Sequence, residues 1–157
     1  MKNILMILFL FLFIKGYSQS QEDEYKKMID SAINLYAQDY LKVSGHLYTG
    51  VSDRKSLYLI DQRDFPYKYT GMPISIIFKT IDLACAGNRN VLKHGIHAWK
   101  IIPFLKSNKI TVRIIDFLIT YKNNSYNFAN GGGSEIVFEY LCTDNKWVIV
   151  KTKNQGL

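Results

Sequence analysis

The stretch KITVRIIDFLITY at residues 109–121 decides the fold class of this chain. Successive side chains of a β-strand point to opposite sides of the sheet, so the stretch divides into two faces. Both faces are largely apolar; Asp116 is the one charged side chain on the first face, and Lys109 and Arg113 lie on the other. The alternation predicts a strand in which Asp116 shares its face with Val112, Ile114, Leu118 and Thr120.

The residues around this strand predict an antiparallel meander with strands at 95–105, 109–121, 134–142 and 146–152. Two of its connections, at 106–108 and 143–145, are short and consist of turn-forming residues. Connections this short force neighbouring strands to pair antiparallel. Between the second and third strands, we expect a small hairpin turn at 123–125 and a bulge or sharp turn at 130–133.

The N-terminal half predicts one long helix at residues 20–43. Its apolar side chains, from Tyr25 to Leu41, recur at the three-four spacing of a helix face. Ser20 is expected to cap the first amides and Gly45 to end the helix. Because the apolar stripe is broad, we expect the helix to lie on a sheet. The pattern also predicts short strands at 57–60, 67–69 and 74–83, and a turn at 87–90.

Segregation of one helix from a run of strands predicts the α+β class. The simplest arrangement is one long N-terminal amphipathic helix packed on a curved antiparallel sheet. The helix at 20–43 and the strands at 95–152 resemble the cystatin-like roll, and more narrowly the nuclear transport factor two-like superfamily with its ketosteroid isomerase-like and SnoaL-like members. The resemblance implies a pocket between helix and sheet and a homodimer. It does not imply one activity, because members range from enzymes to binding modules.

The first residues predict an export signal. An unbroken apolar run from Ile4 to Ile14 follows Lys2. The run is too short for a membrane span, which needs about 20 residues, and it suits the apolar stretch of a signal peptide. Gly16 and Ser18 fit the small residues required before the cut. We therefore expect a signal peptide at 1–18, cleavage between Ser18 and Gln19, and one globular domain at 19–157, located in the periplasm or secreted.

The net charge of the chain is mildly positive and does not by itself indicate a strongly acidic partner. Lys and Arg number 20 against 13 Asp and Glu, which gives a net charge of +7. This excess is mild, and two of the lysines fall in the predicted signal, so we expect no nucleic-acid partner. We also expect no stable membrane span after cleavage. The remaining basic side chains are spread along strands and turns, as on a solvated face.

Two cysteines, Cys85 and Cys142, allow two interpretations. An even count in an exported protein favours a disulfide bond between them. The alternative is a pair of buried thiols acting as small apolar residues. The sequence does not choose between these.

Asp116 is the candidate catalytic residue. Desolvation among aliphatic neighbours disfavours the charged form of a carboxylate, and a carboxyl in that setting can act as a general base or acid. The resemblance to ketosteroid isomerase-like enzymes implies a tyrosine donor beside it. Tyr36, Tyr40 and Tyr58 are the candidates, and we select Tyr40. The alternative is a structural aspartate bonded to an amide, a hydroxyl or a lysine.

Other motifs support no further chemistry. His94 and His97 fall at a spacing of three, which places them on one face only in a helix, so we expect no metal site there. No cofactor motif is present, and the glycines at 131–133 lack the ending of a phosphate loop. Three functional hypotheses remain: a non-catalytic envelope module that binds a small ligand or a protein partner, an isomerase- or dehydratase-like enzyme using Asp116, and a structural envelope protein acting by oligomerisation. The first leads because the sequence shows no catalytic constellation.

Overall fold

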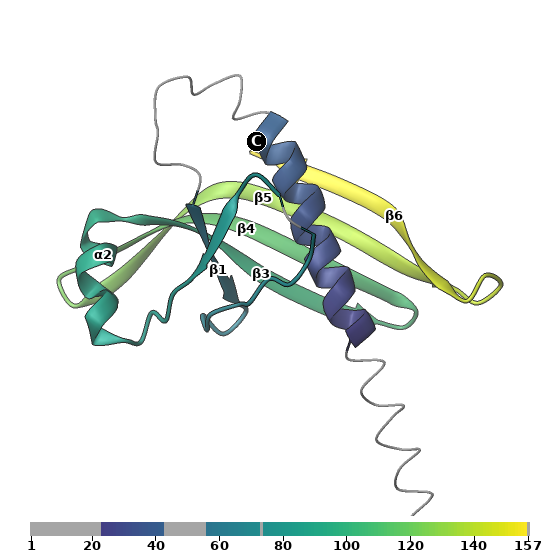
Figure 1. Ribbon diagram of the computed structural model, residues 1–157, viewed down its shortest axis with the longest axis horizontal. Coiled ribbons are helices and arrows are strands. Elements are labelled where there is room, and N and C mark those ends of the chain that lie inside the picture. The colour runs from purple at the N-terminus through teal and green to yellow at the C-terminus, as the bar shows by residue number, and fades with distance from the viewer. Residues whose placement is uncertain (1–22, 43–55, 73, 157) are drawn as a thin grey trace, which may run out of the picture.

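The computed structural model describes residues 23–42, 56–72 and 74–156. Within them the chain is an α+β fold, in which an N-terminal helix at 23–42 packs on a curled six-stranded sheet (Figure 1). This confirms the predicted class and the amphipathic helix. The predicted signal peptide at 1–18, Ser20 and Gly45 lie outside the described residues. No helix of the described part is long and apolar enough to cross a membrane.

The sheet has the strand order β2-β1-β3-β4-β5-β6. Its strands are β1 (Ser56–Asp61), β2 (Ile77–Thr80), β3 (Ile96–Lys106), β4 (Lys109–Lys122), β5 (Ser125–Leu141) and β6 (Lys146–Gln155). β3 to β6 form the predicted antiparallel meander. β5 is longer than expected, because it continues through the segment predicted as a separate small hairpin.

The other edge of the sheet is parallel, so the sheet as a whole is mixed. β1 pairs parallel with both β2 and β3. Parallel neighbours need a long connection, and the segment 62–76 is long enough to return the chain to the start of β2. The predicted strand at 67–69 is part of this connection and is not a strand.

Two apolar clusters cover opposite faces of the sheet. The helix face buries Trp99 of β3 and Ile114 of β4 against helix residues such as Ile33. The back face buries Ile119 of β4 under a short 3-10 helix, η1 (Ala86–Asn88), and a helix, α2 (Arg89–His94). α2 lies where a turn was predicted, and six residues are too few to show helical periodicity. Figure 1 shows α2 at one end of the sheet, away from the crossing N-terminal helix.

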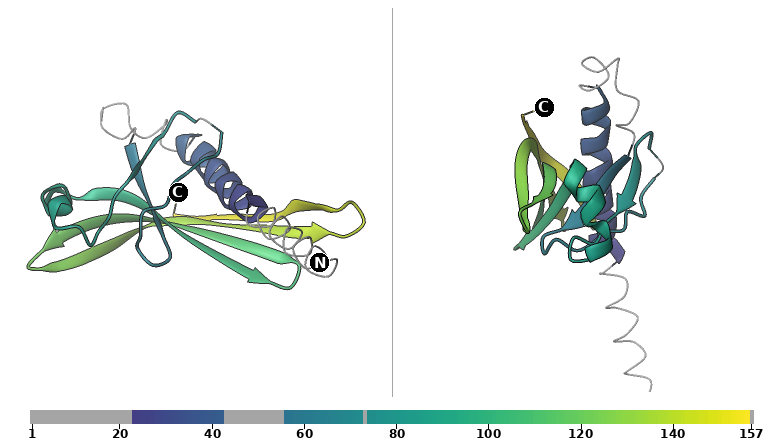
Figure 2. Two further views of the ribbon diagram at one scale, coloured as in Figure 1. Left: turned by 60° about the horizontal axis from the view of Figure 1, so that its bottom comes forward. Right: turned by 90° about the vertical axis from the view of Figure 1, so that its left-hand side faces the viewer.

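β4 changes its buried face halfway along its length. Ile110, Val112 and Ile114 are buried on the helix face, whereas Ile119 and Tyr121 are buried on the back face. Asp116 lies where the buried side of the strand changes. β5 carries a bulge beside it, since Asp116 pairs with Gly132 and Phe117 pairs with Asn130, which leaves Gly131 as the extra residue. The structure thus confirms the predicted bulge. Figure 2 shows the strong twist of the sheet.

Of the two interpretations of the cysteines, the disulfide bond is wrong. Cys85 and Cys142 are both free and exposed. Cys85 lies beside η1 and α2, and Cys142 lies in the turn between β5 and β6, at opposite ends of the sheet (Figure 1). The topology therefore keeps the two thiols apart. The alternative of two buried thiols is wrong as well.

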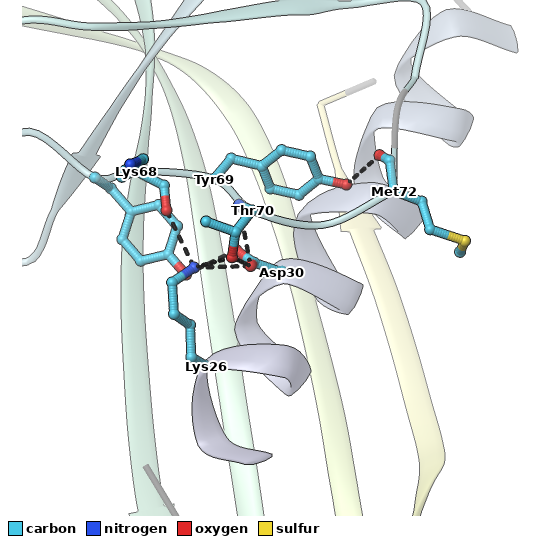
Figure 3. A network of polar contacts seen from close by, with 7 residues as sticks. Lys26, Asp30, Lys68, Tyr69, Thr70 and Met72 are labelled. Carbon is cyan, nitrogen blue, oxygen red and sulfur yellow. Dashed lines mark hydrogen bonds and ion pairs between the residues drawn. The ribbon is translucent and has the colours of Figure 1, made fainter. Parts of the chain in front are cut away.

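A network around Asp30 fastens the 62–76 connection to the N-terminal helix. Asp30 is 5% exposed. Its carboxylate accepts hydrogen bonds from Lys26 Nζ at 2.8 Å, Tyr67 Oη at 2.9 Å, and both the hydroxyl and the amide of Thr70 at 2.7 and 3.2 Å. Figure 3 shows Asp30 facing Thr70 and Lys26. The negative charge is thereby paired and fully hydrogen-bonded, as a buried charge requires.

We predict that Asp30→Asn destabilises the protein by about 3 kcal/mol, because it leaves Lys26 without its counter-charge and weakens three charge-assisted hydrogen bonds. Urea unfolding followed by circular dichroism measures the change. Asp23→Asn is the matched control, since Asp23 is exposed on the first turn of the same helix. Equal stability of the two variants would contradict a structural role for Asp30.

The bulge depends on glycine at position 133. A Cβ atom there would lie 2.1 Å from the carbonyl oxygen of Ile114, which belongs to the neighbouring strand. We predict that Gly133→Ala lowers the free energy of unfolding by about 2–3 kcal/mol. Gly87→Ala is the control, because its Cβ would meet only Cys85 Sγ, at 3.8 Å. If both variants unfolded at a similar urea concentration, β4 and β5 would be able to move apart at Gly133 at little cost in free energy.

Candidate functional site

Asp116 lies near the centre of the sheet, on the helix face. It pairs in register with Trp99 of β3 and Gly132 of β5, and it is 9% exposed. Trp99 shares this face and is fully buried against the N-terminal helix. The predicted face for Asp116 is therefore correct, and the carboxyl is surrounded by apolar side chains.

Four buried polar atoms have no hydrogen-bond partner among the described residues. They are Tyr36 Oη, Trp99 Nε1, Asp116 Oδ1 and Ser134 Oγ. Trp99 and Ser134 lie beside Asp116 on the helix face, because Trp99 pairs with Asp116 and Ser134 pairs with Ile114 two residues away. Tyr36 reaches the same place from the helix. A buried polar group without a partner costs about 1–3 kcal/mol, so four of them on the helix and the sheet face that it covers demand an explanation.

Aromatic rings form the wall of this site. The ring centroids of Tyr36 and Trp99 lie 4.6 Å apart, and those of Tyr40 and Trp99 lie 5.4 Å apart. Phe78 of β2 packs on the other side of Trp99 at 5.6 Å. These rings touch one another, so they position the polar atoms of Tyr36 and Trp99 firmly beside the carboxyl.

The electrostatics confirm that Tyr36 and Asp116 are close. Burial raises the pKa of the Tyr36 hydroxyl, and the negative charge of Asp116 raises it further, followed by a smaller effect of Tyr40. The hydroxyl therefore keeps its proton throughout the physiological range and stays a neutral donor.

The three candidate tyrosines do not share one position. Tyr40, which the sequence selected, lies in the aromatic wall one turn beyond Tyr36. Tyr58 packs with the back-face cluster, on the opposite side of the sheet from Asp116. Tyr36 has a buried hydroxyl without a partner among the described residues, and the charge of Asp116 contributes to raising its pKa.

His97 lies at the outer edge of the site. Its Nδ1 atom is 3.8 Å from Asp116 Oδ1, which is within ion-pair range but too long for a hydrogen bond. The His97 side chain is 44% exposed. His94 is the last residue of α2 and is not part of the Asp116 site. No group of three or more His, Cys, Asp or Glu side chains in the described ranges is arranged to hold a metal ion.

The four atoms together can satisfy a small polar group. The indole of Trp99 only donates, the carboxylate of Asp116 only accepts, and the hydroxyls of Tyr36 and Ser134 do either. A ligand or an ordered water molecule that both donates and accepts would pair with all of them. The sequence alone identified Asp116 and Tyr36 as candidates, but it did not place Ser134, His97 or Trp99 beside Asp116. The strand register carried the missing signal, because it places these residues beside Asp116.

Comparison of the chain with protein-family models, with curated proteins and with solved structures gives no match. The chemistry of the site therefore has to carry any functional proposal.

We predict that Tyr36→Phe leaves the free energy of unfolding unchanged or raises it by up to about 1 kcal/mol, because it removes a buried hydroxyl that lacks a partner. Tyr67→Phe is the matched control. Burial also raises the pKa of Tyr67, but its hydroxyl donates to Asp30, and its loss should destabilise by about 1–2 kcal/mol. Urea unfolding of both variants measures the difference. A loss in Tyr36→Phe as large as in Tyr67→Phe would mean that the Tyr36 hydroxyl serves stability.

Proposed function

We propose that this chain is an exported binding module that holds a small polar ligand between its N-terminal helix and its sheet, against Asp116. The observation that carries the proposal is a set of buried polar atoms without hydrogen-bond partners among the described residues, on Tyr36, Trp99, Asp116 and Ser134, which belong to the helix face of the sheet or to the helix that covers it. Apolar side chains at these positions would avoid the desolvation penalty. Their retention is explained if a ligand completes the hydrogen bonds.

The donor set restricts the ligand. It must present at least one donor to Asp116 and one acceptor to Trp99, as a hydroxyl, an amide or a primary amine next to an oxygen does. His97, whose side chain is 44% exposed and lies 3.8 Å from Asp116, marks the side from which the ligand would enter. Export follows from the N-terminal residues and belongs to the same proposal.

The fold supports a more specific relationship. A single helix packed on a curled sheet is compatible with the cystatin-like roll and with the nuclear transport factor two-like cone, in which the pocket lies between helix and sheet. The Asp116 site occupies that location. We therefore propose the relationship together with the binding role, as an architectural one that transfers no activity by itself.

The second candidate is an isomerase- or dehydratase-like enzyme, and the position of Tyr36 favours it. The Asp116 carboxylate would accept a proton from a carbon next to a carbonyl group. The Tyr36 hydroxyl would donate a hydrogen bond to the oxygen on which negative charge develops. Tyr36 replaces Tyr40 in this role because its hydroxyl lies unpaired near Asp116. The third hypothesis, a structural protein acting by oligomerisation, stays a prediction.

The experiment begins with native mass spectrometry of protein purified from its source cells, to identify a bound adduct. Binding is then followed by fluorescence in a Trp147→Phe background, where Trp99 is the single remaining tryptophan. We predict that Asp116→Asn weakens binding by about 10- to 100-fold, the effect of losing one hydrogen bond to a charged group. The matched control is Asp144→Asn, since Asp144 is exposed in the turn between β5 and β6.

The outcomes separate the candidates. A ligand whose affinity falls in Asp116→Asn but not in Asp144→Asn supports the binding module. Turnover of that ligand, lost in both Asp116→Asn and Tyr36→Phe, would favour the enzyme. An adduct-free protein whose Trp99 emission responds to no compound of the predicted class would reduce the site to a buried ordered water, and the proposal would fail.

A further inference from the structure

The end of the sheet that carries α2 gathers positive charge without acidic partners. Arg89 and Lys93 of α2 and Lys122 at the end of β4 are all exposed, and none forms an ion pair with a described residue. At the opposite end of the meander several cations are paired: Lys109 with Glu139 at 3.3 Å, Arg113 with Glu135 at 2.9 Å, and Lys146 with Asp144 at 3.1 Å. What distinguishes the α2 end is that Lys93 and Lys122 line one hollow, and that Arg89 packs on Tyr121, which lines the same hollow.

Tyr121 organises these groups. The guanidinium of Arg89 lies over the Tyr121 ring, 5.3 Å from its centroid, which holds Arg89 by a cation–π contact. The Tyr121 hydroxyl donates to Asn124 Oδ1 at 3.2 Å. The amide oxygen of Asn124 is thus occupied, and its NH₂ group is left as a donor. One tyrosine thereby positions a cation and an amide donor on the same side of the fold.

A hollow of about 440 Å³ opens beside Tyr121 and Asn124, and Arg89 lies next to it through its contact with the Tyr121 ring. Its lining consists of Lys93, Tyr121, Lys122, Asn123 and Asn124. Two ammonium groups face it, and no carboxylate lines it. Asp82, the acidic residue nearest to α2 in the sequence, accepts a hydrogen bond at its Oδ1 from the amide of Ala84, 2.9 Å away. The hollow therefore offers several donors and no counter-charge.

We propose that this hollow binds an oxyanion of the phosphoryl or sulfate type, held by Arg89, Lys93 and Lys122. Arg89 and Lys93 are four residues apart on one helix, so their like charges repel, and a bound dianion relieves the repulsion. Guanidinium and ammonium groups are the side chains that bind such oxyanions by charge-assisted hydrogen bonds. The site is independent of the Asp116 site, because Tyr121 belongs to the back-face cluster.

The test is isothermal titration of the full chain with inorganic phosphate at constant ionic strength. Arg89→Gln, Lys93→Gln and Lys122→Gln are each expected to weaken phosphate binding by about 5- to 20-fold, and the triple variant to abolish it. Lys106→Gln and Lys153→Gln remove exposed lysines elsewhere on the sheet and should change the affinity less than about twofold. Tyr121→Phe keeps the ring under Arg89 but frees Asn124, and it should weaken binding by about 2- to 3-fold.

The source of the oxyanion is distinguished by a second arm. Vesicles of phosphatidylcholine with and without phosphatidylglycerol are compared in a flotation assay with the same variants. Binding to the anionic vesicles alone, lost in the triple variant, identifies a lipid headgroup, whereas titration with inorganic phosphate alone identifies a free anion. Equal behaviour of the wild type and the triple variant in both arms would overturn the proposal. Asp116→Asn should bind phosphate normally, so failure of the ligand-binding role leaves this inference intact.

Discussion

The structure depends on one strand, β4, whose buried face changes from one side of the sheet to the other. Up to Ile114 the side chains that point to the N-terminal helix are buried, and from Ile119 onward those that point to α2 are buried. A strand normally keeps one face toward the core, because a change of face exposes the opposite set of side chains. Here both faces are apolar, so each half of the strand finds a cover, and two separate clusters stabilise one sheet.

Asp116 occupies the place where neither cover is complete. The bulge at Gly131 interrupts the pairing of β4 and β5 there and increases the local twist. Close packing by apolar groups alone is more difficult at such a point, because the bulge disrupts the regular ladder and bends the strand. A polar cluster can persist there because the surrounding rings of Tyr36 and Trp99 hold it in place. The change of face thus explains why the site lies at the middle of the sheet.

Much of the fold follows from the sequence, because long elements have strong periodic signals. The helix over 23–42 and the strands β3, β4 and β6 fall close to their predicted ranges. The helix α2 was not predicted, because one or two helical turns are too short to show a periodic pattern. The disulfide interpretation was wrong, because the spacing of two cysteines along the chain does not determine their distance in the sheet. The candidate site was predicted in part. Alternation fixes the face of Asp116, whereas its neighbours on β3 and β5 depend on strand register, which alternation alone does not give.

The two buried aspartates show why burial by itself does not identify a site. Asp30 and Asp116 are buried to a similar degree. Asp30 accepts four hydrogen bonds from three side chains and one backbone amide, all within the chain, so its charge is balanced by the fold. One carboxylate oxygen of Asp116 has no such partner, and the imidazole of His97 lies 3.8 Å from it, too far for a hydrogen bond. A fold that fully satisfies one buried carboxylate is able to satisfy another. At Asp116, however, one carboxylate oxygen is left without a hydrogen bond, as are polar atoms of three neighbouring residues. This difference is the physical reason to assign the binding role to Asp116 and the structural role to Asp30.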